Sequence, residues 1–201
     1  MSKDYRNKAL LYHLTPLANL KSILTNGVQS RASLDKDKFT DIADPEILES
    51  RQSQGLEQYV PFHFFSKTPF DYAVQRSSPQ ESFVLLTVRR TYAKSNDWKI
   101  IPSHPLGRKE PEVMDYSDGF NAIDWDLMES EEDGVSYATN NAYKQTCMAE
   151  CLSPTTIPAS TFVSIFVKTL EDKQTVETLL ASSGISPHVN HQPTMFPRNT
   201  A

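Results

Sequence analysis

Five short apolar segments of strand length constrain the fold of this chain more than any other feature. They lie at residues 10–14, 59–65, 82–88, 146–152 and 161–167. Helical patterns are found between and after them, at 16–26, 46–54, from Thr68-Pro69 to Val74, and at 172–181. We therefore expect one α+β domain over residues 1–201 with a strand-rich core. Residues 186–201, which contain three prolines, are expected to form an extended or frayed tail.

The first strand and helix place polar side chains at a junction. Thr15 is expected to cap the helix over 16–26, and Pro16 suits its first turn. His13 would then lie at a strand end, just before a helix N-terminus. Backbone N–H groups at such a terminus favour an anion or a polar ligand.

The region from Lys94 to Asn141 has the weakest pattern. It contains several prolines and the acidic stretch 124–133. We expect mostly loops there, with one short helix, and long loops within a compact domain are often functional.

Charge and composition exclude some classes of protein. The net charge of -5 argues against a general nucleic-acid coat, although a local basic groove is compatible with it. Candidate charges for such a groove are Arg31, Arg89, Arg90, Arg108, Lys109 and Lys144. No apolar run is long enough to span a membrane and the first residues do not form a signal peptide, so we expect a cytoplasmic protein. Cys147 and Cys151 are expected to be reduced core residues, without a metal site.

Glu150 is the most informative candidate for chemistry, because it interrupts an otherwise apolar stretch. A buried carboxylate is costly unless it is paired or used. Such a group can bind a ribose hydroxyl and stabilise positive charge that develops on a sugar carbon, as glycosyl transfer requires. The alternative is a glutamate on an edge strand that faces water.

His13, Arg51 and the aromatic residues each allow two interpretations. His13 could bind a ribose or a carboxamide, or it could be a satisfied core residue. Arg51 could orient a phosphate or a base with its planar guanidinium, or it could be solvated on a helix surface. Several aromatic residues could form a stacking wall or simply fill the core. They are Tyr59, Phe62, Phe64, Phe65 and Tyr72.

Other common chemistries lack their motifs. The six glycines do not form a phosphate-binding Gly-rich loop, and there is no G-x-S-x-G motif. His104, His188 and His191 do not form an H-x-x-x-H metal pair. The cysteines have no histidine nearby in the sequence to activate them.

Taken in order, the segments resemble the DarT family of toxins, which ADP-ribosylate DNA bases with NAD in DarT–DarG systems. The resemblance spans roughly residues 10–170. It is carried by Tyr12-His13-Leu14-Thr15 with Asn19-Leu20, by Ile47-Leu48-Glu49-Ser50-Arg51, by Tyr59 to Phe64 followed by Thr68-Pro69 and Tyr72-Ala73, and by Ala149-Glu150-Cys151-Leu152 with Ile157-Pro158.

The resemblance implies an ADP-ribosyltransferase-like split β-sheet core with flanking helices that holds NAD as co-substrate, without a metal. By carry-over, NAD would be bound by His13, Thr15, Asn19, Arg51 and Tyr72. Glu150 would be the catalytic glutamate, assisted by Arg51. The loop at 140–146 would bind the acceptor through Tyr143, Lys144 and Gln145.

The expected acceptor is a base in single-stranded DNA, because the base must be unpaired to react. Among the bases, thymidine is favoured over guanosine. The expected partner is a macrodomain-type or other antitoxin that removes ADP-ribose, and the chain is expected to be a monomer that does not bind membranes. Three rival interpretations remain. The same fold could modify RNA or protein, the chain could be a non-catalytic module that binds NAD or nucleic acid, or the motifs could match an unrelated α+β domain by chance.

Overall fold

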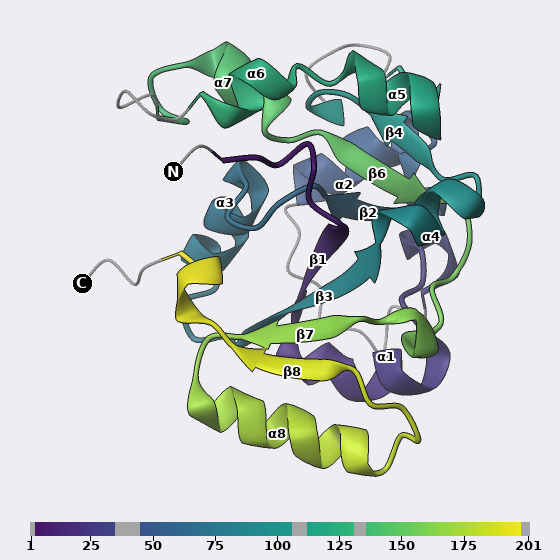
Figure 1. The fold of residues 1–201 in the computed structure, drawn as a ribbon, viewed down its shortest axis with the longest axis vertical. Helices are drawn as coiled ribbons and strands as arrows, with labels where there is room; N and C mark the ends of the chain where they lie inside the picture. Colours follow the sequence, from purple (N-terminus) through teal and green to yellow (C-terminus); the bar gives the residue numbers. More distant parts are fainter. Residues whose placement is uncertain (1–2, 35–44, 106–111, 131–135, 198–201) are drawn as a thin grey trace.

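A mixed sheet with the strand order β5-β4-β6-β2-β1-β3-β7-β8 runs through the molecule (Figure 1). The computed structural model describes residues 3–34, 45–105, 112–130 and 136–197. The strands are β1 (Leu10–Pro16), β2 (Val60–His63), β3 (Phe83–Arg89), β4 (Lys99–Ile101), β5 (Met114–Asp115), β6 (Glu150–Ser153), β7 (Ser164–Val167) and β8 (His188–His191). The α+β prediction is therefore confirmed.

Helices surround this sheet. They are α1 (Leu20–Asn26), α2 (Pro45–Ser53), α3 (Pro69–Ser77), α4 (Arg90–Ser95), α5 (Tyr116–Ala122), α6 (Trp125–Glu129), α7 (Asn141–Thr146) and α8 (Leu170–Ala181). Figure 1 shows α8 beside β7 and β8, whereas α5, α6 and α7 lie at the opposite end of the sheet. No helix in the described ranges has the length and apolar character required to cross a membrane.

The sheet is narrowly connected at its centre. β1 pairs with β3 along its whole length, from Leu10↔Arg89 to Pro16↔Phe83. In contrast, the register between β1 and β2 has the single pair Tyr12↔His63. β2 then pairs with β6, and His63 lies opposite Glu150. The two halves of the sheet therefore separate beyond this point, which agrees with the expected split core and leaves space beside His13 and Glu150.

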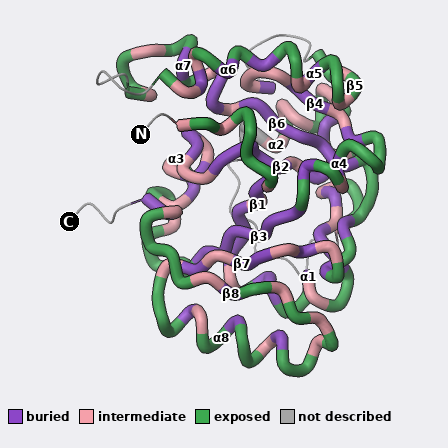
Figure 2. Tube along the Cα trace, viewed as in Figure 1, coloured by how far each residue is buried: buried purple, intermediate pink, exposed green. Residues whose placement is uncertain are grey.

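The core lies on the central strands. Figure 2 shows buried residues along β1, β2 and β3 and exposed residues on the outer side of α8. Six of the seven residues of β3 are buried, as its apolar sequence predicts. Cys147 and Cys151 are 1% and 0% exposed and form no disulfide, so the prediction of reduced core cysteines is confirmed.

The helix that starts after Thr68 begins with a capping box. Thr68 accepts a hydrogen bond from the backbone N–H of Asp71, and the Asp71 carboxylate accepts one from the N–H of Thr68. Pro69 occupies the first turn, where its missing N–H costs nothing. This capping box fixes the start of α3 and therefore the direction in which its side chains point.

Several local expectations were wrong. β1 continues through Thr15 and Pro16, so Thr15 does not cap a helix and His13 is a mid-strand residue. Residues 141–146 form α7, whose cap is the Asn140 side chain, and the strand expected from 146 begins only at Glu150. The region 94–141 contains β4, β5, α5 and α6 in addition to loops.

Of the two forms expected for the C-terminal segment, extended or frayed, the described part contains an extended strand. β8 pairs in parallel with β7, from Ser164↔His188 to Val167↔His191. Phe196 is 2% exposed and packs in a cluster with Tyr12, Leu14 and Leu85. The expectation for residues 198–201 lies outside the described residues.

Gly27 provides a test of the packing beside α1. It has φ +79°, and an added Cβ would lie 2.6 Å from the carbonyl oxygen of Ile157. We expect Gly27→Ala to lower the free energy of unfolding by about 2–3 kcal/mol, because left-handed strain and steric overlap add. Urea unfolding measures this value. Gly184→Ala is the matched control, since Gly184 has φ +74° and no atom near the new methyl group. Equal losses would show that the contact with Ile157 is unimportant.

Candidate functional site

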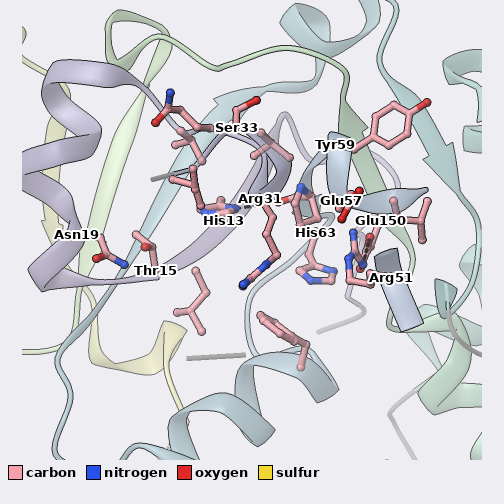
Figure 3. Close-up of a pocket in the computed structure, with 18 of the residues that line it drawn as sticks. His13, Thr15, Asn19, Arg31, Ser33, Arg51, Glu57, Tyr59, His63 and Glu150 are labelled. Atoms are coloured by element: carbon pink, nitrogen blue, oxygen red, sulfur yellow. Dashed lines mark hydrogen bonds and ion pairs between the residues drawn. The ribbon is translucent and has the colours of Figure 1, made fainter. Parts of the chain in front are cut away.

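A pocket of about 420 Å³ opens where the two halves of the sheet separate. It is lined by residues of β1, α1, α2, β2 and β6 and by the segment that follows α1 (Figure 3). Its polar and charged lining includes His13, Thr15, Asn19, Arg31, Arg51, His63, His104 and Glu150. Apolar residues make up much of the remaining wall. This combination is typical of a pocket for a small molecule or cofactor.

Glu150 and Arg51 form a largely buried ion pair in this pocket. Nη1 of Arg51 donates to Oε1 and Oε2 of Glu150, at 2.9 and 3.0 Å. The side chains are 7% exposed for Glu150 and 14% for Arg51. Glu150 is therefore not an edge-strand residue that faces water, and Arg51 is not a solvated arginine. The pairing compensates the cost of burying the carboxylate.

Within the described residues, the second terminal nitrogen of Arg51, Nη2, is buried and has no hydrogen-bond partner. A buried charged donor without an acceptor is costly, and native proteins rarely retain one without a reason. A ligand oxygen that enters the pocket, such as that of a phosphate or a ribose, would satisfy this nitrogen.

His13 presents a hydrogen-bond acceptor. Its Nδ1 lies 2.8 Å from the carbonyl oxygen of Pro61, which can only accept, so Nδ1 carries the hydrogen. Burial lowers the pKa of His13 to about 4. The ring is therefore neutral at physiological pH, and Nε2 is unprotonated. That nitrogen can accept a hydrogen bond from a ligand hydroxyl or amide.

The pH dependence of stability tests this protonation state. Because the folded pKa of about 4 lies below the ordinary value near 6.5, the unfolded state binds the proton more readily. We expect the stabilising contribution of neutral His13 to be present above pH 6.5 and lost as the pH falls to 4. Urea unfolding at several pH values should show a smaller loss over this window in His13→Gln. An unchanged profile in that variant would contradict the assignment.

Several of the residues predicted from sequence meet in the pocket and others do not. His13, Thr15, Asn19, Arg51 and Glu150 line it together. Tyr72 does not, because Phe70, two positions earlier on α3, faces the pocket instead. The expected acceptor loop is the helix α7. From it, Tyr143 and Lys144 line a second hollow, and the Gln145 carbonyl accepts a hydrogen bond from the His104 N–H at 2.8 Å.

The basic residues predicted to form a groove do not all lie at the pocket. Arg90 is buried at 7% exposure, and its guanidinium donates to the carbonyl oxygens of Leu10, Arg6 and Phe64. It is therefore a structural residue. Arg31 lines the pocket, and Arg89 is exposed but lines neither hollow. Arg108 and Lys109 lie outside the described residues.

Two histidines in the pocket had no assigned role from the sequence. His63 is 6% exposed, lies opposite Glu150 in the sheet, and has Nδ1 3.2 Å from the Ala149 carbonyl. Its position in the segment Tyr59–Phe64 was the available signal. His104 follows β4. Burial lowers the pKa of His104, while the charge of nearby Glu150 acts in the opposite direction. No pattern around His104 predicts this position.

The fold and site agree with what the sequence matches. Over residues 12–197 the chain matches the family described as "ssDNA thymidine ADP-ribosyltransferase, DarT". It therefore belongs to the DarT family of ADP-ribosyltransferases, as the motifs predicted. No curated protein matches the chain significantly.

Solved structures share the fold. Thermus sp. 2.9 DarT in complex with ADP-ribosylated ssDNA superimposes with a TM-score of 0.83 at 20% identity, over 98% of this chain and 100% of that one. The same protein in complex with NAD+ gives 0.76 at 16% identity, over 95% and 98%. Thermosipho africanus DarTG in complex with ADP-ribose gives 0.77 at 21% identity, and the match covers 94% of this chain but 51% of that chain.

Proposed function

We propose that this chain transfers ADP-ribose from NAD to a thymidine base of single-stranded DNA and releases nicotinamide. The observation that carries the proposal is the buried pair of Glu150 and Arg51, in the pocket of a chain that belongs to the DarT family. This pair can hold a ribose hydroxyl, stabilise the positive charge that develops on the ribose carbon, and accept the proton of the acceptor base. The Thermus structures with NAD+ and with ADP-ribosylated ssDNA support the same substrates here.

The pocket residues fit NAD. Nη2 of Arg51, which has no partner in the described part of the chain, is a donor for a phosphate or ribose oxygen. Nε2 of His13 is an acceptor for a ribose hydroxyl or the carboxamide N–H, and Thr15 and Asn19 offer further polar groups along the same strand and turn. Arg31 adds a positive charge to the pocket. When bound, NAD supplies the ADP-ribosyl group, with nicotinamide as the leaving group.

Glu150 is proposed to have two functions. Its carboxylate holds a ribose hydroxyl and stabilises the positive charge that develops at the ribose carbon. It also accepts the proton of the thymine nitrogen as that nitrogen bonds to the ribose carbon and the bond to nicotinamide breaks. Arg51 positions the carboxylate through Nη1 while Nη2 remains available to the ligand.

The family suggests a biological context for this activity. We propose that the chain is a monomeric toxin that acts in the cytoplasm, where NAD and single-stranded DNA are available. Thermosipho DarTG contains a further half beyond the part that this chain matches. We propose that a macrodomain-type antitoxin, which removes ADP-ribose from DNA, counteracts this chain.

The test is incubation of the chain with labelled NAD and oligonucleotides, analysed by mass spectrometry. We expect the mass of one ADP-ribose on single-stranded DNA that contains thymidine, and none on duplex DNA. Oligonucleotides that lack thymidine but contain guanosine distinguish the acceptor base. Transfer to RNA alone would show that the substrate is RNA and not DNA. Intact NAD with every strand would instead favour a non-catalytic module.

A further inference from the structure

His63 is a pocket residue that the proposed mechanism leaves without a function. It lines the pocket although it is only 6% exposed. In the sheet it lies on β2 opposite Glu150 of β6, and such cross-strand neighbours extend from the same face. Figure 3 shows the His63 ring beside the ion pair of Arg51 and Glu150. The contacts of this ring therefore bear directly on the proposed catalytic carboxylate.

Nδ1 of His63 holds the peptide group that precedes Glu150. It lies 3.2 Å from the carbonyl oxygen of Ala149, which can only accept, so Nδ1 donates the hydrogen bond. The carbonyl of Ala149 and the N–H of Glu150 belong to one planar unit. Fixing the carbonyl therefore fixes the direction in which the chain enters Glu150. On its other side, Ala149 is held by its own N–H, which donates to the Thr146 carbonyl at 3.1 Å.

The remaining contacts of the His63 ring lead to the start of α3. The ring of Phe70, which also lines the pocket, lies 5.8 Å away between centroids, at an angle of 32°. Burial raises the pKa of the Asp71 carboxyl, and the charge of nearby His63 acts in the opposite direction. Asp71 belongs to the capping box that starts α3. His63 therefore connects the start of β6 to the start of α3, two borders of the pocket that are distant in sequence.

Glu150 needs support from its backbone because its ion pair does not fix the plane of the carboxylate. Among the described residues, Arg51 contacts both carboxylate oxygens through Nη1 alone. A bidentate pair would use two nitrogens and would fix the carboxylate in one plane. With one nitrogen the carboxylate can still rotate about the contact. Its orientation therefore depends on how firmly the backbone at Glu150 is held.

We propose that His63 is a positioning residue for Glu150. Its Nδ1–H holds the peptide group before Glu150, and packing against Phe70 keeps that donor in place. This inference rests on the proposed function and adds to it a residue that acts without contacting the reacting atoms. A displacement of about 1 Å can cost about 10²-fold in rate. The binding of NAD is shared among many other pocket groups, so loss of the donor should lower the rate of transfer more than the affinity for NAD.

Two variants separate the donor of His63 from its ring. His63→Phe keeps a ring beside Phe70 but cannot donate, whereas His63→Asn loses the ring but keeps an N–H as many bonds from Cβ as Nδ1. We expect His63→Phe to lower the single-turnover rate about 10–100-fold and to change the NAD dissociation constant by less than about twofold. His63→Asn should retain most of the rate. His188→Phe makes the same exchange at an exposed position of β8 and should change neither value.

A double-mutant cycle shows whether His63 acts through Glu150. In the Glu150→Gln background, His63→Phe should change the remaining rate by less than about twofold, because the carboxylate that it positions is gone. A residue needed only for folding would lower the rate by the same factor in both backgrounds. Equal factors would therefore overturn the inference. An unchanged rate in His63→Phe, or an equal loss of rate and NAD affinity, would also overturn it.

NMR spectroscopy tests the inference independently of transfer. The amide nitrogen of Glu150 shares a peptide group with the carbonyl of Ala149, so its signal responds when that carbonyl loses a hydrogen bond. We expect this signal to shift in His63→Phe and to stay near its original position in His63→Asn. If the unchanged protein transferred no ADP-ribose, the proposed function would fail, while this shift would still support a hold of His63 on Glu150. Transfer by a protein whose Glu150 signal does not move in His63→Phe would leave the proposed function and remove His63 from it.

Discussion

Glu150→Gln is expected to reduce ADP-ribose transfer by about 10²–10⁴-fold, the range typical of losing a general base. The amide keeps the size of the side chain and one oxygen for the hydrogen bond from Arg51. It cannot accept the proton of the acceptor base, and it carries no negative charge to stabilise the ribose carbon. The measurement is the single-turnover rate at saturating NAD and single-stranded DNA, with mass spectrometry as the readout.

A second glutamate in the same pocket supplies the control. Glu57 lines the pocket and is only partly buried (Figure 3). Glu57→Gln makes the same charge change without removing the partner of Arg51, and its rate should remain within a few-fold of the unchanged protein. If both variants lost activity equally, the field of the pocket as a whole would matter and Glu150 would have no special function. Near-normal transfer by Glu150→Gln would remove Glu150 from the mechanism.

The sequence predicted the helices and strands of the site better than the contacts between them. The apolar strands at 10–14, 59–65 and 82–88 and the capped helix after Thr68 follow from local patterns, and the structure confirms them. Arg51 and Glu150 are 99 residues apart, and no spacing rule connects them. Their contact depends on the strand order and on where α2 lies, which are tertiary features. Only the resemblance to the DarT family predicted that Arg51 and Glu150 act together.

The failures have local physical causes. Thr15 precedes a proline and a helical pattern, as a cap does, but pairing with Val84 keeps it in β1. The six residues of α7 are too short to show a helical period, and the cap by Asn140 decides their structure. Tyr72 is two positions beyond Phe70, so helical geometry points it away from the pocket. His104 depends on a loop position that no sequence pattern encodes.

Arg51→Met is expected to destabilise the fold as well as abolish transfer. It leaves the carboxylate of Glu150 buried without its cation, and breaking such a pair typically costs about 3 kcal/mol or more. Urea unfolding measures this loss. Arg51→Lys retains the charge but offers no planar pair of donors, so it should recover part of the stability and lose most of the transfer activity.

The double variant Arg51→Met/Glu150→Leu separates stability from catalysis. Removing both charges leaves no unpaired ion, and replacing a buried pair with apolar groups of similar size is often close to neutral for stability. We therefore expect an unfolding free energy near that of the unchanged protein, together with transfer as low as in Arg51→Met. Since a site retained for stability alone would tolerate this exchange, a stable but inactive double variant would show that the pair is kept for its chemistry. Recovery of transfer along with stability would instead make Arg51 and Glu150 a structural pair.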